Sequence, residues 1–276
     1  MTVPARLLCR RLSAGAERLP PLYRLLLVAR HRNSPFLRRI VSPGHDLVIE
    51  GFPRSATSFA VRAFMAANGW RDPRVATHVH SPAQVILAVR WGLPTLVCLR
   101  EPEAAVVGWM AYARQAGQLP PGLTRRRELA WVRAQTLRYA RFHAALLPWQ
   151  AGVLLARFDE VTGDFGAVLD RLNARFGCEF DRFDHTAAAT RAVFARAGAH
   201  LSPDPQREVL KAGYAALYRS PENARPRRCA IAAYRALLAH RPPVPEPAGS
   251  VRRPPVPAGP PGPLAPDSGS ADAPVS

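Results

Sequence analysis

Residues 46–59 read DLVIEGFPRSATSF and set the expectations for the whole chain. Asp46 to Gly51 is a short apolar run that ends in glycine and is soon followed by proline, a pattern typical of a buried strand. A helical pattern follows from Thr57 to Asn68. A short loop between a strand and a helix directs backbone N–H groups and the positive helix end at one point. The sequence therefore predicts an anion site at this loop.

This loop differs from the nucleoside-triphosphate loop G-x-x-x-x-G-K-[ST]. Gly51 and Ser58 occupy its first and last positions, but Ala56 replaces the second glycine and Thr57 replaces the lysine. An NTPase without that lysine lacks the main charge on the transferred group. The cation lies instead within the loop, at Arg54. A P-loop nucleotide kinase, which also needs a carboxylate for Mg²⁺ after a later strand, is therefore the weaker reading.

The rest of the chain alternates apolar runs with helical patterns. Strands are predicted at 74–80, 94–99 and 152–158. Helices are predicted from 82 onward and at 103–116, 124–147 and 164–176, and the remainder to about residue 240 is helical in pattern. This alternation predicts an α/β, P-loop-like, three-layer fold with a central parallel sheet flanked by helices. Ligands of such sheets bind beyond the carboxyl ends of the strands.

Three regions are expected along the chain. Residues 1–44 form a basic helical lead-in, in which leucines lie among arginines, and which either packs on the domain or contacts a membrane surface. Residues 45–240 form the α/β domain. Residues 241–276 hold 12 prolines and too few apolar side chains to offset ordering entropy, so a disordered Pro-rich C-terminal tail is expected.

Charge and cysteine content restrict the function less than the loop does. The formal net charge of +18 predicts attraction to polyanions, but Lys211 is the only lysine, and this arginine bias also fits a coding bias. No nucleic-acid reading motif accompanies the arginines, so no specific nucleic acid is expected as a partner. The four cysteines have no paired spacing, which predicts neither a disulfide framework nor a metal site. Without a membrane-length apolar stretch or a secretory leader, a cytoplasmic protein is expected.

Residues after two of the strands carry a family resemblance. Pro53, Arg54, Ser55, Thr57, Ser58 and Phe59 match the phosphosulfate loop of the sulfotransferases, with Ala56 at the position of its usual glycine. Arg100-Glu101-Pro102, after the strand at 94–99, resembles the segment of that family that binds the 3′-phosphate, although Gly108 stands where the family has serine. Phe158-Asp159-Glu160 is a softer match, and a capped helix start explains it equally well.

The resemblance covers about residues 46–180 and implies a sulfotransferase. Such an enzyme transfers a sulfuryl group from 3′-phosphoadenylyl sulfate (PAPS) to a hydroxyl or amine, with no metal. The resemblance implies cofactor-binding roles for seven residues: Arg54, Ser55, Ala56, Thr57, Ser58, Phe59 and Arg100. Arg54 would also stabilise the charge that develops on the leaving phosphate. A protein of the same fold with lost or altered activity is the alternative, favoured by Ala56 and Gly108.

Two histidines are candidates for the general base. His78 follows Thr77 and resembles the Thr-His pair of the cytosolic sulfotransferases, and His80 would face the same side of an extended chain. Histidine suits this task because its pKa lies near neutrality. Glu50, next to the loop, is the carboxylate alternative. The acceptor, whether carbohydrate, lipid or small metabolite, is not encoded in any recognisable residue.

Overall fold

The structure is a computed structural model that describes residues 17–68, 74–197 and 204–239. In these residues, four parallel strands form one sheet in the order β2-β1-β3-β4. The strands are β1 (Leu47–Gly51), β2 (Val75–Thr77), β3 (Thr95–Leu99) and β4 (Leu154–Arg157). The predicted α/β fold, with a parallel sheet between helices, is confirmed.

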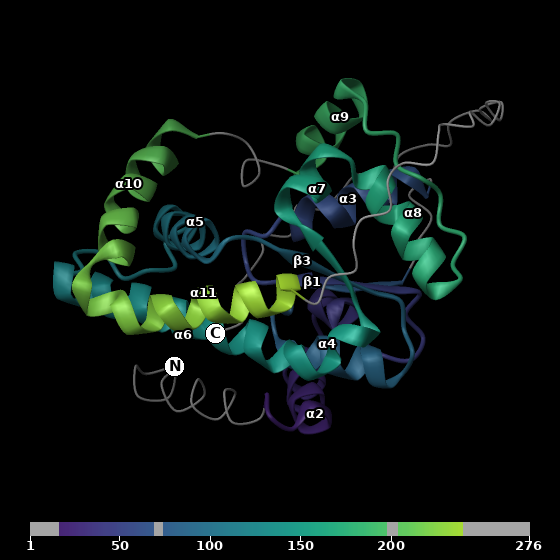
Figure 1. The fold of residues 1–276 in the computed structure, drawn as a ribbon, viewed down its shortest axis with the longest axis horizontal. Coiled ribbons are helices and arrows are strands. Elements are labelled where there is room, and N and C mark those ends of the chain that lie inside the picture. The colour runs from purple at the N-terminus through teal and green to yellow at the C-terminus, as the bar shows by residue number, and fades with distance from the viewer. Residues whose placement is uncertain (1–16, 69–73, 198–203, 240–276) are drawn as a thin grey trace.

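The described α-helices surround this sheet (Figure 1). They are α2 (Pro20–His31), α3 (Thr57–Ala67), α4 (Pro82–Arg90), α5 (Pro102–Gln115), α6 (Arg125–Leu146), α7 (Phe158–Gly163), α8 (Phe165–Phe176), α9 (Ala187–Ala197), α10 (Pro205–Arg219) and α11 (Ala224–Ala239). Three short 3₁₀ turns, Pro35–Arg39, Leu147–Gly152 and Pro221–Asn223, join some of them.

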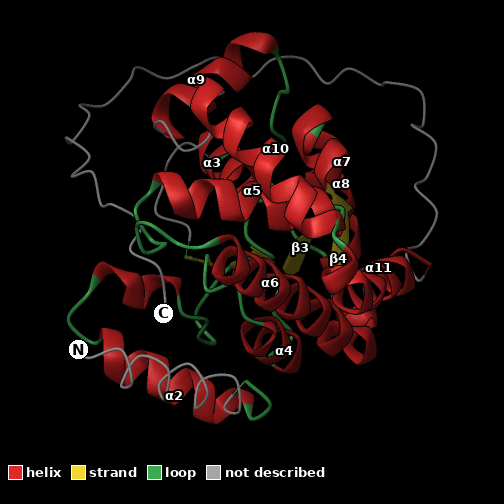
Figure 2. Cartoon of the chain, turned by 90° about the vertical axis from the view of Figure 1, so that its left-hand side faces the viewer, coloured by secondary structure: helices red, strands yellow, loops and turns green. Residues whose placement is uncertain are grey.

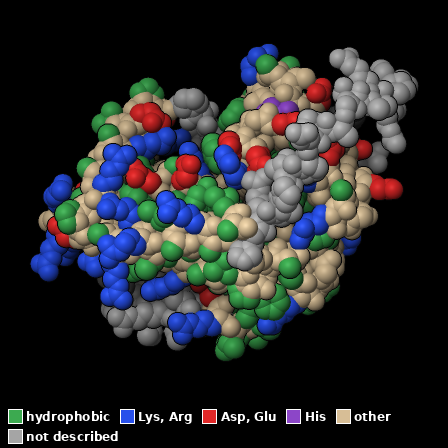
Figure 3. Space-filling model, viewed as in Figure 1, with side chains coloured by type: hydrophobic (Ala, Val, Ile, Leu, Met, Phe, Trp, Pro, Cys, Tyr) green, Lys and Arg blue, Asp and Glu red, His purple; other side chains and the backbone are tan. Residues whose placement is uncertain are grey.

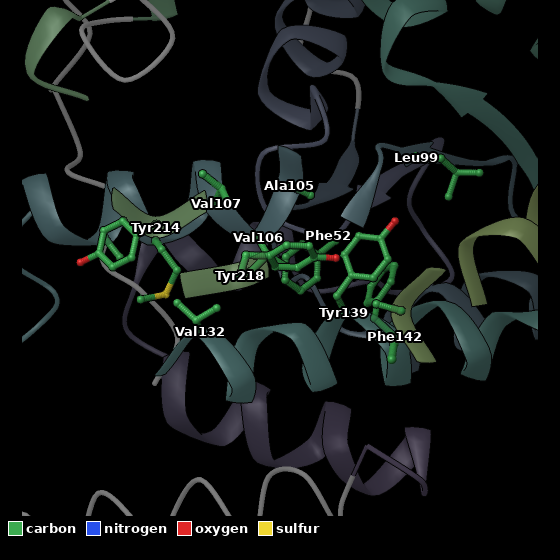
Figure 4. Close-up of a cluster of buried hydrophobic side chains, with 14 of the residues drawn as sticks. Phe52, Leu99, Ala105, Val106, Val107, Val132, Tyr139, Phe142, Tyr214 and Tyr218 are labelled. Carbon is green, nitrogen blue, oxygen red and sulfur yellow. The ribbon is translucent and has the colours of Figure 1, made fainter. Parts of the chain in front are cut away.

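Both faces of the sheet are buried, which explains why its strands are continuous apolar runs. On one face Ile49, Leu96 and Cys98 pack with residues of α3, α8 and α9. On the other, Val97 and Leu99 join a cluster built from α5, α6, α10 and α11, several of whose side chains are drawn in Figure 4. Figures 1 and 2 show the resulting layers, with α3, α7 and α8 on one side of the strands and α4, α6 and α11 on the other.

The carboxyl end of β1 lies at the point where the connections diverge. From β1 the chain passes through α3 to β2 on one side, and then through α4 back across β1 to β3 on the other side. Ligands of open α/β sheets bind at such a point. The loop that follows Gly51 therefore occupies the position where this architecture places a binding site.

Two of the predicted strands are shorter than expected. The strand predicted at 74–80 ends at Thr77, because His78 and His80 have left-handed φ angles of 58° and 52°. The expectation that these histidines lie along an extended chain is therefore wrong. The strand predicted at 152–158 ends at Arg157, and α7 begins at Phe158, which is the capped helix start that Phe158-Asp159-Glu160 also allowed. Glu160 starts that helix by accepting the backbone N–H of Arg157 at 2.7 Å.

Of the two terminal regions predicted from the sequence, the structure describes only part of the first. The predicted lead-in is present in part as α2, while residues 1–16 and the Pro-rich tail at 241–276 lie outside the described residues. Cys98, Cys178 and Cys229 are free thiols. None of the described helices has the length and apolar character needed to span a bilayer.

Candidate active site

The loop between β1 and α3 requires glycine at its start. A Cβ atom on Gly51 would lie 2.6 Å from the carbonyl oxygen of Cys98 on the neighbouring strand, closer than a real Cβ contact allows. Arg54 and Ala56 both have φ angles of 69°, in the left-handed region. Ala56 is the N-cap of α3 and provides no side-chain cap. The first N–H groups of α3 therefore have no capping side chain and are available to an anion.

Two hydroxyl groups in and after this loop are buried without a good partner. Ser55 is fully buried and Thr57 nearly so, and among the described residues neither hydroxyl meets a nitrogen or oxygen partner. Thr57 faces the thiol of Cys98, which is only a weak hydrogen-bond donor. A buried hydroxyl without a partner costs about 1–3 kcal/mol. Most buried hydroxyls in proteins have a partner, so these two are unusual and mark the loop as a candidate site.

Arg100 is held against the same loop. One of its guanidinium nitrogens, Nη1, donates to the carbonyl oxygen of Arg54 at 2.8 Å, and the guanidinium lies 3.9 Å from the ring centre of Phe158. The hydroxyl of Tyr139 donates to the carbonyl oxygen of Arg100 at 2.5 Å. The loop, the end of β3 and the start of α7 therefore meet at this guanidinium.

Two acidic residues, Glu101 and Glu103, follow Arg100 closely in the sequence and could have paired with it at the surface. Within the described residues Arg100 forms no salt bridge with Glu101 or Glu103, and Glu103 pairs instead with Arg219. Burial lowers the pKa of Arg100, with Glu101 opposing that shift. A guanidinium keeps its proton in proteins, so Arg100 presents a positive charge beside the loop.

The side chain of Arg54 extends along α5. Its guanidinium lies 5.6 Å from the ring centre of Tyr112, and a Cβ atom on Gly108 would lie 3.6 Å from its Cβ. A glycine at position 108 therefore leaves room beside the Arg54 side chain, where a serine would add a hydroxyl. Burial, followed by the charges of Arg207 and Arg100, lowers the pKa of Arg54 to about 10.

Arg207 is a residue that the sequence patterns did not single out. It is 5% exposed, and its Nε donates to Oε1 of Gln115 at 2.8 Å. Gly108, Tyr112 and Gln115 follow one another along one face of α5, so Arg54 and Arg207 lie along the same stripe. One signal was available in the sequence: Arg207 lies in the first turn of α10, where a helix disfavours positive charge.

The two histidines approach the loop from a tight turn after β2. Nε2 of His78 lies 2.8 Å from Oγ of Ser58, and its Nδ1 lies 3.0 Å from Oγ1 of Thr77. Nδ1 of His80 lies 2.7 Å from the carbonyl oxygen of Gly51, which requires a proton on Nδ1. The two ring centres are 5.6 Å apart. The left-handed turn, rather than an extended strand, brings the two rings together.

Glu50 holds this turn in place. Its fully buried carboxylate accepts the N–H groups of Val79 at 2.8 Å and His80 at 3.1 Å, and the side-chain amide of Gln84 at 2.8 Å. Burial raises the pKa of Glu50 to about 7, although these donors favour the ionised form. With its oxygens occupied in this way, Glu50 serves the geometry of the histidine turn.

The raised pKa of Glu50 predicts a pH-dependent stability. The folded chain keeps the carboxyl proton up to about pH 7, while the unfolded chain loses it near the ordinary value of 4.5. Rising pH therefore lowers the contribution of Glu50 to the free energy of unfolding between these values, by up to about 3 kcal/mol. Glu50→Gln cannot titrate, so the stability of wild type relative to Glu50→Gln should fall across this window.

Urea unfolding of both proteins at stepped pH values measures this difference. Burial lowers the pKa of His143 to about 4, so that residue gives an opposite slope, but it does so in both proteins and cancels in the comparison. A difference that stays constant across the window would contradict the assignment.

The left-handed backbone of Ala56 leads to a second prediction. A non-glycine residue in this region carries strain of about 1–2 kcal/mol, which glycine does not. Ala56→Gly is therefore expected to stabilise the fold by about 1 kcal/mol and to raise Tm by about 2–4 °C. The matched control is Ala134→Gly at an exposed position inside α6, which should lose about 1 kcal/mol. Equal losses in both variants, measured by thermal unfolding, would contradict the strain at position 56.

Phe59, the last of the predicted site residues, does not present its side chain to a ligand. Phe59 is buried among Phe165, Phe183 and Phe194, so only its backbone can reach a ligand.

A hollow of about 290 Å³ lies between α6 and α10, away from the loop, and is lined by Glu128 and Tyr214 among others. Across the described residues, no group of three or more His, Cys, Asp or Glu side chains could hold a metal ion.

Comparison with known proteins gives a remote likeness among solved structures. No protein-family model matches the chain, and no curated protein matches it. Among solved structures it is similar to a mouse sulfotransferase, SULT7A1, in complex with PAP. The two share 14% sequence identity and a TM-score of 0.37, over 71% of this chain and 90% of the mouse chain.

Proposed function

We propose that this chain is a sulfotransferase that moves a sulfuryl group from PAPS to a hydroxyl or amine. One observation carries the proposal: at the uncapped start of α3, the guanidinium of Arg100 contacts the loop at Arg54, and the ring of His78 contacts the first turn of the helix. The carbonyl oxygen of Arg54 accepts from Arg100, and Ser58 in the first turn of α3 touches His78. The site thus combines anion binding with a group that can accept a proton.

The residues present fit the phosphates of the proposed donor nucleotide. Backbone N–H groups at the start of α3, with the hydroxyls of Ser55, Thr57 and Ser58, would bind the 5′-phosphate. Arg100 would bind the 3′-phosphate through its planar guanidinium, which suits phosphate oxygens. Since Gly108 offers no hydroxyl there, the charge of Arg207 is proposed to supplement this subsite, next to Arg54. The low pKa of Arg54 is consistent with a cationic cluster that an anion would stabilise.

The proposed reaction requires no other participant than donor, acceptor and these side chains. The sulfur–oxygen bond to the 5′-phosphate breaks, a bond from sulfur to the acceptor oxygen or nitrogen forms, and the acceptor proton passes to His78. Arg54 and the loop N–H groups would stabilise the negative charge that develops on the phosphate oxygen that leaves. Thr77 and Glu50 would orient the histidine turn.

The experiment that tests the proposal is a thermal-shift titration with adenosine 3′,5′-bisphosphate, ADP and ATP. A ligand at 100 times its Kd stabilises the fold by about 2.7 kcal/mol. For a domain of this size that corresponds to a rise in Tm of roughly 5–10 °C. The bisphosphate should give this rise at a lower concentration than ADP or ATP. A preference for ATP, increased by Mg²⁺, would instead favour a nucleotide kinase.

A second candidate, a nucleotide-binding protein without transfer activity, is favoured by Ala56 and Gly108. The left-handed alanine strains the loop, and the glycine removes a possible hydroxyl from the phosphate site. Release of adenosine 3′,5′-bisphosphate from PAPS separates the two candidates. Tight nucleotide binding with no release in the presence of a broad set of hydroxyl and amine acceptors would support the binding protein.

A further inference from the structure

One face of α2 exposes leucine side chains to solvent. Leu19, at its N-cap, and Leu25 are 60% and 61% exposed, and Leu22 and Leu26 are also exposed. The spacing of residues 19, 22 and 26 places them on one stripe of the helix. The opposite face, with Tyr23 and Leu27, is buried in the domain. The helix is therefore apolar on two sides. One apolar side packs on the domain, and the other faces away from the protein.

These leucines form the largest group of exposed apolar side chains in the described residues. The other large exposed ones are Trp91, Phe194 and Val209. Trp91 lies apart from the leucines, because its ring packs at 5.6 Å from the guanidinium of Arg24, which points back to the domain and donates to the carbonyl oxygen of Val41 at 2.7 Å. In Figure 3 hydrophobic side chains and arginines appear together at the lower edge of the molecule, where Figure 1 places α2. We name this surface, made by Leu19, Leu22, Leu25 and Leu26, the α2 face.

The surroundings of the α2 face are strongly basic. Residues 17–46 contain six arginines and only two acidic residues. The arginines are Arg18, Arg24, Arg30, Arg32, Arg38 and Arg39. Of the two acids, burial raises the pKa of Glu17, and Asp46 is paired with Arg74. An apolar helix face bordered by arginines has the two properties that bind a helix to an anionic lipid surface.

We propose that the α2 face docks on an anionic lipid surface. Charge complementarity favours this occupant over two others. A second copy of the chain would bring two sets of arginines together, and residues 1–16 carry Arg6, Arg10 and Arg11 with no acidic residue. Both would add positive charge to a face that is already basic, whereas phosphatidylserine headgroups would neutralise it.

The docked helix packs directly on the candidate active site. Tyr23 and Leu27, on the inner face of α2, pack in one cluster with Val79 and Ala83. Val79 lies between the two histidines of the candidate site. An acceptor held at the lipid surface would therefore be close to the histidine turn, a consequence that rests on the proposed function, whereas the docking itself does not.

Co-sedimentation of the full chain with vesicles, without nucleotide, tests the docking. Phosphatidylcholine vesicles with about one third phosphatidylserine are compared with pure phosphatidylcholine. The key variant replaces Leu22, Leu25 and Leu26 by serine, which keeps every charge. We expect wild type to bind the anionic vesicles only, and the triple variant to bind them about 10-fold or more weakly. Val209→Ser, at an exposed position on α10, is the matched control and should bind like wild type.

Three results would overturn the proposal. Undiminished binding of the triple variant would show that net charge alone attracts the protein. If the triple variant is less stable than wild type without vesicles and still binds vesicles like wild type, the chain itself covers the α2 face. A wild-type dimer in sedimentation equilibrium that the variant disperses would show self-association. As a second variant with the leucines intact, Arg30→Gln with Arg32→Gln should weaken vesicle binding and reduce its salt dependence.

Discussion

Replacing Arg54 by glutamine is expected to lower the rate of sulfuryl transfer by about 10³- to 10⁵-fold. An arginine that stabilises the charge of a loose transition state contributes an effect of this size. In this chain the left-handed backbone at position 54 directs the residue out of the loop, and Tyr112 and Gly108 accommodate its side chain. Release of adenosine 3′,5′-bisphosphate from PAPS, in the presence of phenol acceptors, measures the rate.

The matched control for this variant is Arg62→Gln, on the outward part of α3 beyond the loop. It removes one positive charge from α3 outside the loop and should change the rate by less than about 3-fold, since it leaves the loop unchanged. Arg54→Lys restores a point charge without the planar fork and should recover only part of the rate. Equal rates for wild type and Arg54→Gln, with both proteins folded, would remove Arg54 from the reaction.

Arg207 gives this prediction a further check. Because its charge lowers the pKa of Arg54, the two side chains interact, and their variants should not be additive. We expect Arg207→Gln alone to weaken binding of the bisphosphate. Its effect should be smaller when Arg54 is already glutamine. Strictly additive losses would mean that the two guanidiniums act on separate ligands.

The sequence predicted the parallel sheet and the loop because both depend on local patterns. An apolar run that ends in glycine marks β1, an apolar run that follows Pro94 marks β3, and the spacing of Gly51, Arg54 and Ser58 marks the loop between a strand and a helix. These signals need no knowledge of distant contacts. The fold followed from them because buried strands that alternate with helices have few stable arrangements.

The parts that the sequence did not predict depend on contacts between distant segments. The left-handed turn that carries His78 and His80 is held by Glu50, about thirty residues earlier in the chain. Arg207 reaches the neighbourhood of Arg54 only because α10 packs on α5. No periodicity in the sequence reports such contacts. By contrast, the positive φ at Ala56 agrees with a signal in the sequence, because glycine is usual at this position of the loop that residues 53–59 resemble.

The roles of the two histidines are expected to separate when each is replaced by alanine. His78→Ala should lower turnover by about 10²- to 10⁴-fold and leave the affinity for adenosine 3′,5′-bisphosphate within about 3-fold, because His78 is the proposed base. His80→Ala should cost less, since the contact of His80 with the Gly51 carbonyl positions the loop and does not accept the substrate proton. Rates and thermal-shift affinities of both variants measure this difference.

A series of phenol acceptors of increasing pKa distinguishes a base from a residue that only supports the loop. An acidic phenol is already largely ionised and needs no base, whereas a weakly acidic one must lose its proton during transfer. The deficit of His78→Ala should therefore grow with the pKa of the acceptor, while that of His80→Ala should stay constant. The loss of rate in His78→Ala could instead be independent of acceptor pKa, or the pKa dependence could appear only in His80→Ala. Either result would show that proton transfer does not depend on His78. The contact between His78 and Ser58 would then serve only to anchor the start of α3.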